Sequence, residues 1–264
     1  MIELASQSDT SEIRRLWDEA FPEEPLFNNW FFECRYRPDT CLVLREDGVI
    51  KAMAQQLCYE LKDVGKVSYI YGAATKQEYR RQGMMRRLLN FSFDMDKKRG
   101  RAASILIPQN KPLFDFYSAL GYKTAFYVHS GTFEGKADTT GFELRNASDD
   151  DIPFMDSLYT EKAGKNYILR TYEYWREQIN MFRTLDGEVF ILLNKGNPVG
   201  YAFYNGDFVQ EIFTPYTDIM LSLMCACFGK PLKYVTVGED TPIGMICSYG
   251  KPIEGKSYLN LMFN

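Results

Sequence analysis

The chain has 264 residues, of which 45% are hydrophobic and 15% aromatic, enough apolar material for a folded core and for one or two domains. A formal net charge of −4 argues against a basic nucleic-acid-binding protein. No apolar run reaches the ~18–20 residues that a membrane-spanning helix needs, and the first residues lack the features of a signal peptide. We therefore expect a cytoplasmic protein that has neither a nucleic-acid partner nor a membrane partner.

Cysteine and histidine usage indicates no metal site. The 6 cysteines form no C-x-x-C pair, and the only histidine, His129, has no Cys or acidic partner nearby in the sequence. His129 lies in an apolar, strand-like run, so we interpret it as structural. Cys58, Cys225 and Cys227 stand within apolar runs and are expected to be reduced, buried thiols.

The first half alternates strand and helix patterns. Strands are expected at 2–5, 40–45, 49–61, 66–75, 102–108 and 123–133. Helices are expected at about 10–20, from Pro25 to Pro38, from the turn before Met85 to Lys97–Gly100, and from Pro112 to Gly121. An Asp-Gly turn at 47–48 predicts a hairpin between the second and third strands.

The most informative stretch runs from Tyr69 to Asn90. An apolar strand gives way to the turn Arg80-Arg81-Gln82-Gly83-Met84-Met85, and a helical period begins there. A helix start carries unpaired backbone N–H groups and a partial positive charge. Gly83 allows a ligand to approach the main chain, so these conditions suit a pyrophosphate.

This turn resembles the Arg/Gln-x-x-Gly-x-Gly/Ala signature of the GNAT superfamily of N-acetyltransferases. Arg80 and Gly83 match it, whereas Met85 stands where a small residue is usual. A second resemblance, to the pattern Asn-x-x-Ala/Leu-x-x-Phe-Tyr-x-x-x-Gly-Phe/Tyr, lies at 110–122. Its matching residues are Asn110, Leu113, Phe116, Tyr117, Gly121 and Tyr122.

The resemblance implies a site for acetyl-CoA as co-substrate. In the family, strand backbone at the position of Ala73, Ala74 and Thr75 pairs with pantetheine, and a backbone N–H there stabilises the oxyanion. The resemblance implies that the turn and the helix start bind the phosphates. It also implies that an Asn side chain binds the pantetheine arm. The corresponding residues are Arg80, Arg81, Gln82, Gly83, Met84, Met85, Arg86 and Asn110. Tyr117 matches the tyrosine beside the thioester sulfur, the general acid.

The second half repeats the order of elements without the chemistry. A polar linker at 135–141 separates residues 1–134 from residues 142–264. Expected strands lie at 142–145, 188–194, 198–204 and 208–213, and expected helices begin near Ile152 and span 172–185 and 217–228. No Arg-x-x-Gly turn follows Phe213, and no second Asn…Phe-Tyr pattern occurs.

We therefore expect an α/β (α+β) protein of two tandem GNAT domains with mixed central sheets flanked by helices. Residues 1–134 form the acetyl-CoA domain, and residues 142–264 form a degenerate domain that lacks the motif. This arrangement resembles the enhanced-intracellular-survival (Eis-like) acetyltransferases, whose turn also has a bulky residue after the glycine. Those relatives usually add a sterol-carrier-like domain, for which this chain leaves no room.

The implied reaction is direct acetyl transfer from acetyl-CoA to an amine of a small molecule or peptide. Residues 67–75 contain no acid, so the general base is open between Glu60, a terminal carboxylate and a water relay. Two alternatives stay open: a catalytically silent acyl-CoA-binding pair, and a transferase with another acyl donor. The oligomeric state and the amine are not readable.

Overall fold

The computed structural model describes residues 1–206 and 208–261, and the chain folds into two compact units. The first unit contains Met1–Thr124 and Gly244–Glu254, and the second contains Ala125–Ile243 and Gly255–Asn264. Both units are mixed β-sheets flanked by helices, as expected for the fold class. Among the described residues, no helix is both long enough and apolar enough to cross a membrane.

The sheet of the first unit has the strand order β1-β2-β3-β4-β5, followed by the end of β11. All neighbours in this sheet are antiparallel except β4 and β5, which are parallel. Its strands are β1 (Ile2–Leu4), β2 (Cys41–Glu46), β3 (Val49–Leu61), β4 (Gly65–Thr75), β5 (Ala103–Leu106) and the last residues of β11 (Leu232–Ser248). The hairpin between β2 and β3 turns at Asp47 and Gly48, both at positive φ, as the Asp-Gly pair predicts.

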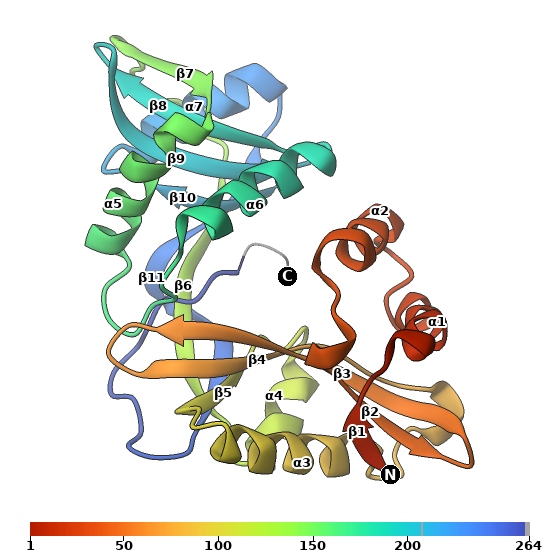
Figure 1. Ribbon diagram of the computed structural model, residues 1–264. Coiled ribbons are helices and arrows are strands. Elements are labelled where there is room, and N and C mark those ends of the chain that lie inside the picture. Colours follow the sequence, from red (N-terminus) through yellow and green to blue (C-terminus); the bar gives the residue numbers. More distant parts are fainter. Residues whose placement is uncertain (207, 262–264) are drawn as a thin grey trace. The chain divides into compact units, whose positions relative to one another are not determined.

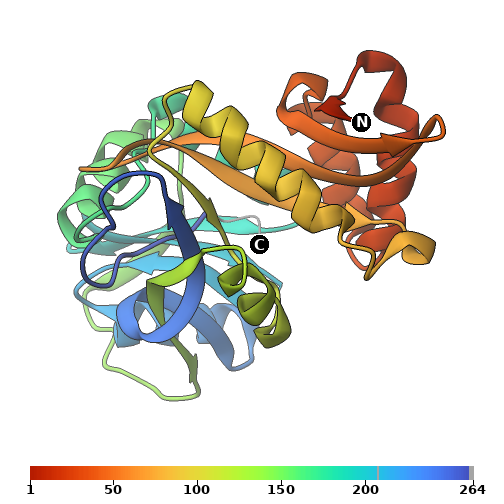
Figure 2. The ribbon, with the colours of Figure 1, turned by 90° about the horizontal axis from the view of Figure 1, so that it is seen from below.

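Helices cover both faces of this sheet (Figure 1). One face carries α3 (Met84–Lys98), which runs across the strands in Figure 2, and α4 (Lys111–Ser118) packs into the same apolar cluster. The opposite face carries α1 (Thr10–Ala20) and α2 (Pro25–Trp30). The α2 segment continues as a π-helical turn at Phe31–Arg35, so the expected single helix up to Pro38 has two parts.

A buried carboxylate holds the returning segment of β11 and the residue after it in the first unit. Asp96 of α3 is 0% exposed and accepts hydrogen bonds from Ser68 (2.6 Å), Gln56 (2.7 Å) and the hydroxyl of Tyr249 (2.7 Å). Burial raises the pKa of Asp96. Because Met245–Ser248 also pair with β5, the segment is fixed by backbone and side chains together.

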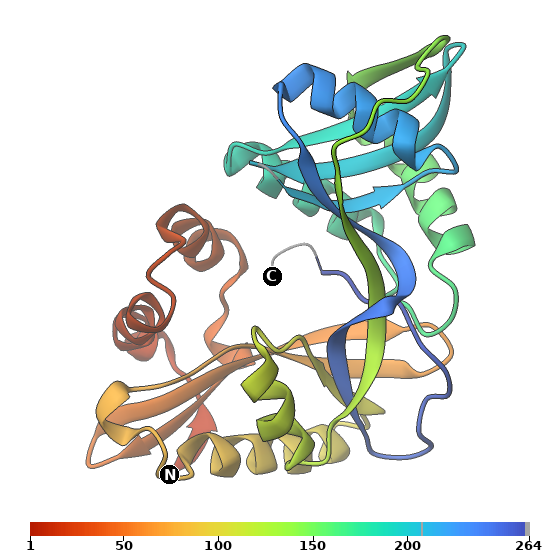
Figure 3. The same cartoon turned by 180° about the vertical axis from the view of Figure 1, so that it is seen from behind.

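The second unit is built on the strand order β11-β10-β9-β8-β7, and β6 pairs with β11. Its strands are β6 (Lys123–Phe133), β7 (Phe142–Asn146), β8 (Glu188–Asn194), β9 (Asn197–Asn205) and β10 (Phe208–Phe213). One face carries α7 (Thr217–Phe228), and the other carries α5 (Ile152–Lys162) and α6 (Tyr172–Thr184) (Figure 3).

A buried ion pair lies at the centre of the face that α5 and α6 cover in the second unit. The side chains of Arg170 and Glu211 are both 0% exposed and form two parallel hydrogen bonds of 2.6 and 2.7 Å. The hydroxyl groups of Tyr201 and Tyr258 also donate to Glu211, and Arg170 donates to the carbonyl of Asn260. The pair thereby fastens the chain after Ser257 to the sheet of the second unit.

The compact units exchange segments relative to the domain ranges proposed from the sequence, 1–134 and 142–264. β6 lies almost wholly in the second unit, and residues 244–254 lie in the first. The reason is the long strand β11, whose two parts pair with β10 and with β5. No element was expected from the sequence after residue 228, so this strand was not predicted.

The cysteines are all free, but none of the three expected to be buried is buried: Cys58 and Cys227 are exposed, and Cys225 is half-buried. Cys58 lies near the end of β3, two residues before the exposed Glu60 on the same face of the strand, where the helix cover has ended. Cys227 lies on α7, whose buried residues are Met220, Leu221 and Met224. Hydrophobic neighbours in sequence did not predict burial, because exposure depends on the face and on where the covering element ends.

Candidate active site

The candidate site lies in the first unit, where β4 and β5 separate. Their pairing covers Val67–Tyr69 and Ala103–Ile105, and β5 ends one residue later, at Leu106. β4 continues to Thr75 and remains paired with β3. The edge of β4 beyond Tyr69 therefore has no paired neighbour in β5, which leaves main-chain groups for a ligand that lies along the strand.

A bulge interrupts β4 at this open edge. Met53 pairs with Ala74 and Gln55 pairs with Tyr71, so two residues of β4, Gly72 and Ala73, face one residue of β3. Gly72 has φ of +54°. The bulge leaves Gly72 and Ala73 out of the regular ladder, next to Ala74, at the groups predicted to bind pantetheine and the oxyanion.

The start of α3 has the geometry of an anion site. Arg81 and Gly83 both have positive φ (62° and 75°), and no side chain caps the helix. The first intrahelical bond runs from the N–H of Arg87 to the carbonyl of Gly83, so the preceding N–H groups of the first turn lack helical partners. A Cβ on Gly83 would meet nothing within 4 Å, and the space in front of the turn is open.

The side chains of the turn divide into two groups. Nε of Arg80 donates to the carbonyl of Thr75 (3.0 Å), and Gln82 donates to the carbonyl of Glu78 (3.0 Å). These two side chains shape the turn. Arg81 and Arg86 are exposed, and neither forms an ion pair with another described residue. They place two positive charges beside the helix start, where a phosphate would lie.

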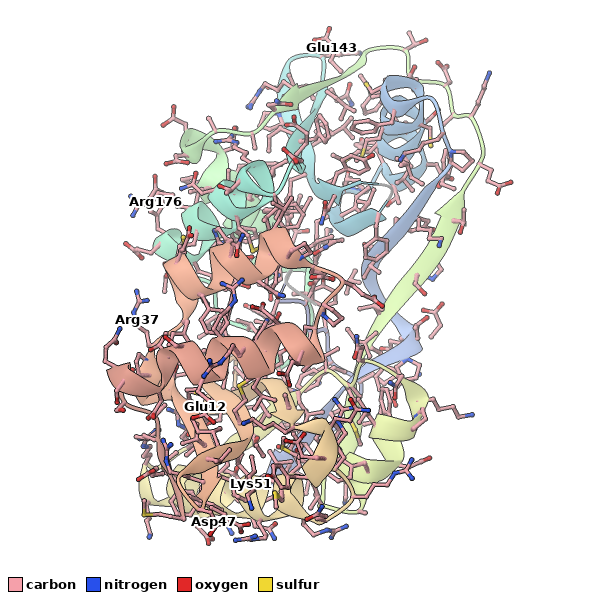
Figure 4. The ribbon with its side chains drawn as sticks, turned by 90° about the vertical axis from the view of Figure 1, so that its right-hand side faces the viewer. Glu12, Arg37, Asp47, Lys51, Glu143 and Arg176 are labelled. Atoms are coloured by element: carbon pink, nitrogen blue, oxygen red, sulfur yellow. The ribbon has the colours of Figure 1, made fainter. Side chains whose placement is uncertain are left out.

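Charged side chains brace the base of the turn (Figure 4). Glu12 of α1 accepts from the N–H of Ile50 (3.0 Å) and from Lys76 (3.3 Å), the residue that follows β4. Lys51 pairs with Glu46 (3.1 Å) and lies over the ring of Tyr79, 4.5 Å from its centroid. Several such contacts in one network hold the turn more firmly than one exposed pair does.

Glu46 also fixes the first turn of α3. It accepts from Lys51 and from Arg87 (2.8 Å), and the bond from Arg87 is the first cause of the lowered pKa of Glu46. Arg87 is therefore a positioning residue of the helix start, and the sequence analysis did not single it out.

One apolar cluster joins the predicted parts of the site. Met84 and Tyr117 are buried in it, and Ala73 and Met85 pack against it. Met85, which departs from the family signature, thus points toward core residues and leaves the backbone N–H side clear. Ala74 is 5% exposed and Thr75 is half-buried at the end of β4.

Tyr117 lies on α4 with its ring 8% exposed. It packs edge-on against Tyr122, with ring centroids 5.7 Å apart. Among the described residues its hydroxyl makes no hydrogen bond, whereas the hydroxyl of Tyr122 bonds Ser104 (2.7 Å). Burial raises the pKa of Tyr117 to about 12, so the phenol is protonated at neutral pH and can donate a proton.

Asn110 has a structural task in addition to the one predicted from the resemblance. It is exposed, and it is the N-cap residue of α4, where its Oδ1 accepts from the N–H of Leu113 (3.3 Å). The side-chain NH₂ group is left for a ligand carbonyl. Tyr117 is seven residues further along the chain on the same helix, so Asn110 also sets the start of the helix that carries the phenol.

Glu60, the base candidate from the sequence, lies at the wrong end of the hairpin. It is exposed and pairs with Lys66, six residues before Gly72, or roughly 20 Å along the strand. Glu24, which was not among the bases expected from the sequence, acts electrostatically on a residue next to the bulge. Burial first, and then the negative charge of Glu24, raises the pKa of Tyr71, the residue just before Gly72.

Aromatic rings cover the bulge on the side of α1 and α2. The ring of Trp17 lies against Gly72, stacks on Phe31 (centroids 4.6 Å apart) and contacts Tyr71 (5.6 Å). Nε1 of Trp17 donates to Oδ1 of Asn28 (2.7 Å). Trp17 and Phe31 are buried, so these rings are core residues that also form the wall beside the open edge of β4.

Comparisons with known proteins agree with this geometry. Residues 1–125 match the family model described as "Acetyltransferase (GNAT) domain". No curated protein sequence matches the chain.

Solved structures show the same fold over most of the chain. A probable N-acyltransferase from Enterococcus faecalis aligns with a TM-score of 0.70 and 16% identity, over 93% of this chain and 72% of that one. Eis1 from Mycobacterium abscessus aligns at 0.63 and 12%, over 94% and 73%. A tandem GNAT protein from the clavulanic acid biosynthesis pathway aligns at 0.58 and 12%, over 96% and 100%. The chain therefore has the fold of tandem GNAT N-acetyltransferases, and its residues 1–125 match the GNAT acetyltransferase domain.

Proposed function

We propose that the chain is a cytoplasmic N-acetyltransferase that moves the acetyl group of acetyl-CoA directly to a primary amine of a small molecule or peptide. The observation that supports the proposal is that one apolar cluster of the first unit joins three features. They are the open, bulged edge of β4, the uncapped start of α3, and Tyr117. Acetyl-CoA supplies the activated acyl group, and the protein positions it and moves protons.

Binding of the donor rests on main-chain groups. The N–H groups of Gly83, Met84 and Met85 bind the pyrophosphate, with the charges of Arg81 and Arg86 beside them. The peptide groups of Ala73–Thr75 pair with the pantetheine amides as a neighbouring strand would, and the NH₂ group of Asn110 donates to a carbonyl of that arm. Arg80 and Gln82 keep the turn in shape.

Chemistry needs an oxyanion donor and a proton for the leaving thiolate. We assign stabilisation of the oxyanion to a backbone N–H at Ala73 or Ala74, because these residues lie at the bulge of the open strand edge. Tyr117 protonates the thiolate. A phenol of pKa about 12 is a weak acid. The apolar surroundings also raise the pKa of the leaving thiol, so the difference between the pKa values of the phenol and the thiol is reduced.

The second unit is proposed to be a degenerate GNAT-like domain, since its sequence has no counterpart of the 80–86 turn or of the 110–122 pattern. The proposed domain ranges of 1–134, 135–141 and 142–264 refer to sequence motifs, whereas the compact units exchange strands.

Isothermal calorimetry with acetyl-CoA, followed by a thiol-release assay over an amine library, tests the proposal. We expect binding in the micromolar range and release that depends on an amine. Binding without release in any amine would favour a silent acyl-CoA-binding protein, and release only with longer acyl donors would favour another transferase. No binding at high micromolar acetyl-CoA would overturn the proposal.

A further inference from the structure

A second cluster of chemically reactive side chains lies in the second unit, on the ribbon formed by β6 and the first part of β11 (Figure 3). Nδ1 of His129 is 2.9 Å from Oδ2 of Asp240, and Nε2 of the same ring is 3.2 Å from the hydroxyl of Tyr234. The order of contacts is phenol, imidazole, carboxylate. This is the arrangement by which a base activates a hydroxyl nucleophile, with tyrosine as the hydroxyl residue.

The carboxylate fixes the state of the imidazole. An ionised carboxylate only accepts hydrogen bonds, so Nδ1 carries the proton and donates to Asp240. This bond is the first cause of the lowered pKa of Asp240. In the neutral ring Nε2 is then an acceptor, and it faces the O–H of Tyr234. Asp240 thus positions the lone pair of His129 toward the phenol.

Glycines make room for this contact on both strands. A Cβ on Gly238 of β11 would lie 2.5 Å from Cβ of His129, and a Cβ on Gly131 of β6 would lie 3.0 Å from the ring of Tyr234. Gly238 therefore lets the strand of His129 approach closely, and the ring of Tyr234 occupies space that a side chain at Gly131 would fill. A cluster held by two such close approaches is preorganised rather than a chance surface contact.

The cluster is also open to a reagent. The side chains of His129 and Asp240 are 44% and 58% exposed, and Tyr234 is half-buried with its ring against the apolar cluster under α7. A further charged group near the cluster is Lys256, which donates to the carbonyl of Glu239, lies over the ring of Tyr127 and also lowers the pKa of Asp240.

We propose that Tyr234 is a nucleophilic site that accepts an acyl group from an activated acyl donor, with His129 as its base and Asp240 as the residue that positions His129. The phenol oxygen forms a bond to the acyl carbon, the bond from that carbon to the leaving group breaks, and Nε2 of His129 takes the phenolic proton. With an aryl ester the leaving group departs as a phenolate, and His129 returns the proton to water.

Brief treatment of the full chain with p-nitrophenyl acetate at pH 7 tests the proposal. Peptide mass spectrometry then compares acetylation of Tyr234 with that of Tyr172, which is 47% exposed in the same unit and is the matched control. We expect Tyr234 to react roughly ten-fold faster than Tyr172, or more. This factor is smaller than the rate gain that a fully positioned general base gives in an enzyme. Equal rates would overturn the proposal, and this comparison needs no variant.

Two variants identify the base. His129→Gln retains polar contacts but cannot take the proton, so Tyr234 should react at the rate of Tyr172, while Asp240→Asn should give an intermediate rate. Labelling that persists unchanged in His129→Gln, with unchanged thermal unfolding, would show that the triad is only a structural contact.

Discussion

The ring of Trp17 lies so close to Gly72 that a Cβ on this glycine would be 2.0 Å from Cζ3 of the indole. Gly72 also has φ of +54°, which disfavours any other residue. The bulge in β4 and the indole of α1 therefore fit each other, and the shape of the open edge depends on both.

We expect Gly72→Ala to destabilise the protein by about 1–3 kcal/mol through overpacking, and to abolish acetyl transfer because the bulge must move. Urea unfolding and thiol release measure the two effects. Gly65→Ala is the control: it lies on the same strand with φ of +103°, but a Cβ there meets nothing within 4 Å. If both variants behave alike, backbone strain rather than the contact with Trp17 is responsible.

Tyr117→Phe is expected to lower kcat roughly ten-fold or more, the lower part of the range for general acids, with acetyl-CoA affinity nearly unchanged. Tyr122→Phe is the control, because its hydroxyl is committed to Ser104 in the same cluster. The acid form of Tyr117 is the active one and is lost only as the pH rises through about 12. Tyr117→Phe should therefore lower kcat by the same factor at every pH between 6 and 10. An unchanged kcat removes Tyr117 from the mechanism.

Gly83→Glu is expected to prevent acetyl-CoA binding while the fold is retained, because a carboxylate would face the pyrophosphate at the start of α3. Gly100→Glu is the matched control. It has φ of +67° beyond the other end of the same helix, and a Cβ there also meets nothing within 4 Å. Because both substitutions introduce similar backbone strain, a difference in acetyl-CoA affinity measured by calorimetry reports the position of the carboxylate. Normal affinity in Gly83→Glu would contradict the placement of the phosphates.

Glu24→Gln tests whether the carboxylate near Tyr71 deprotonates the amine. If Glu24 acts as base, kcat should fall by roughly ten-fold or more, with KM for acetyl-CoA unchanged. The control is Glu23→Gln, which removes a neighbouring exposed charge. An equal and small effect of both variants would assign proton removal to water instead.

Asp96 should make the stability of the first unit depend on pH. Its pKa is raised in the folded chain, so the folded protein holds this proton more tightly than the unfolded chain, where an aspartate has a pKa of about 3.9. The contribution is present in full below that value and is lost as the pH rises through the folded pKa. Asp96→Asn removes this dependence, measurable as the difference in unfolding free energy from the parent between pH 3 and 7. A constant difference would contradict the raised pKa.

The local elements were largely readable from the sequence, and the reasons are local. The helix starts and ends around Met84–Lys98 and Lys111–Ser118 follow from glycine, proline and basic residues at the expected positions. The parallel pairing at the site follows from a strand, helix and strand in succession.

The features that the sequence did not predict depend on contacts between residues far apart in the chain. The partners of His129 are 105 and 111 positions away, so its cluster has no local signature. β11 contains Pro242, Gly238 and the charged pair Glu239-Asp240, which break the alternation expected of a strand. The position of Glu24 near Tyr71 follows only from the packing of α2 against the sheet.

The pairing of β5 with Met245–Ser248 has a consequence for biosynthesis. A ribosome that has released the first 134 residues has produced Tyr117 and every residue proposed to bind acetyl-CoA, yet the edge of β5 still lacks its partner, which lies more than 130 positions downstream. The nascent amino-terminal half thus exposes an unpaired strand until Met245–Ser248 have been synthesised. Truncation after the polar linker should therefore give an aggregating fragment instead of a minimal enzyme.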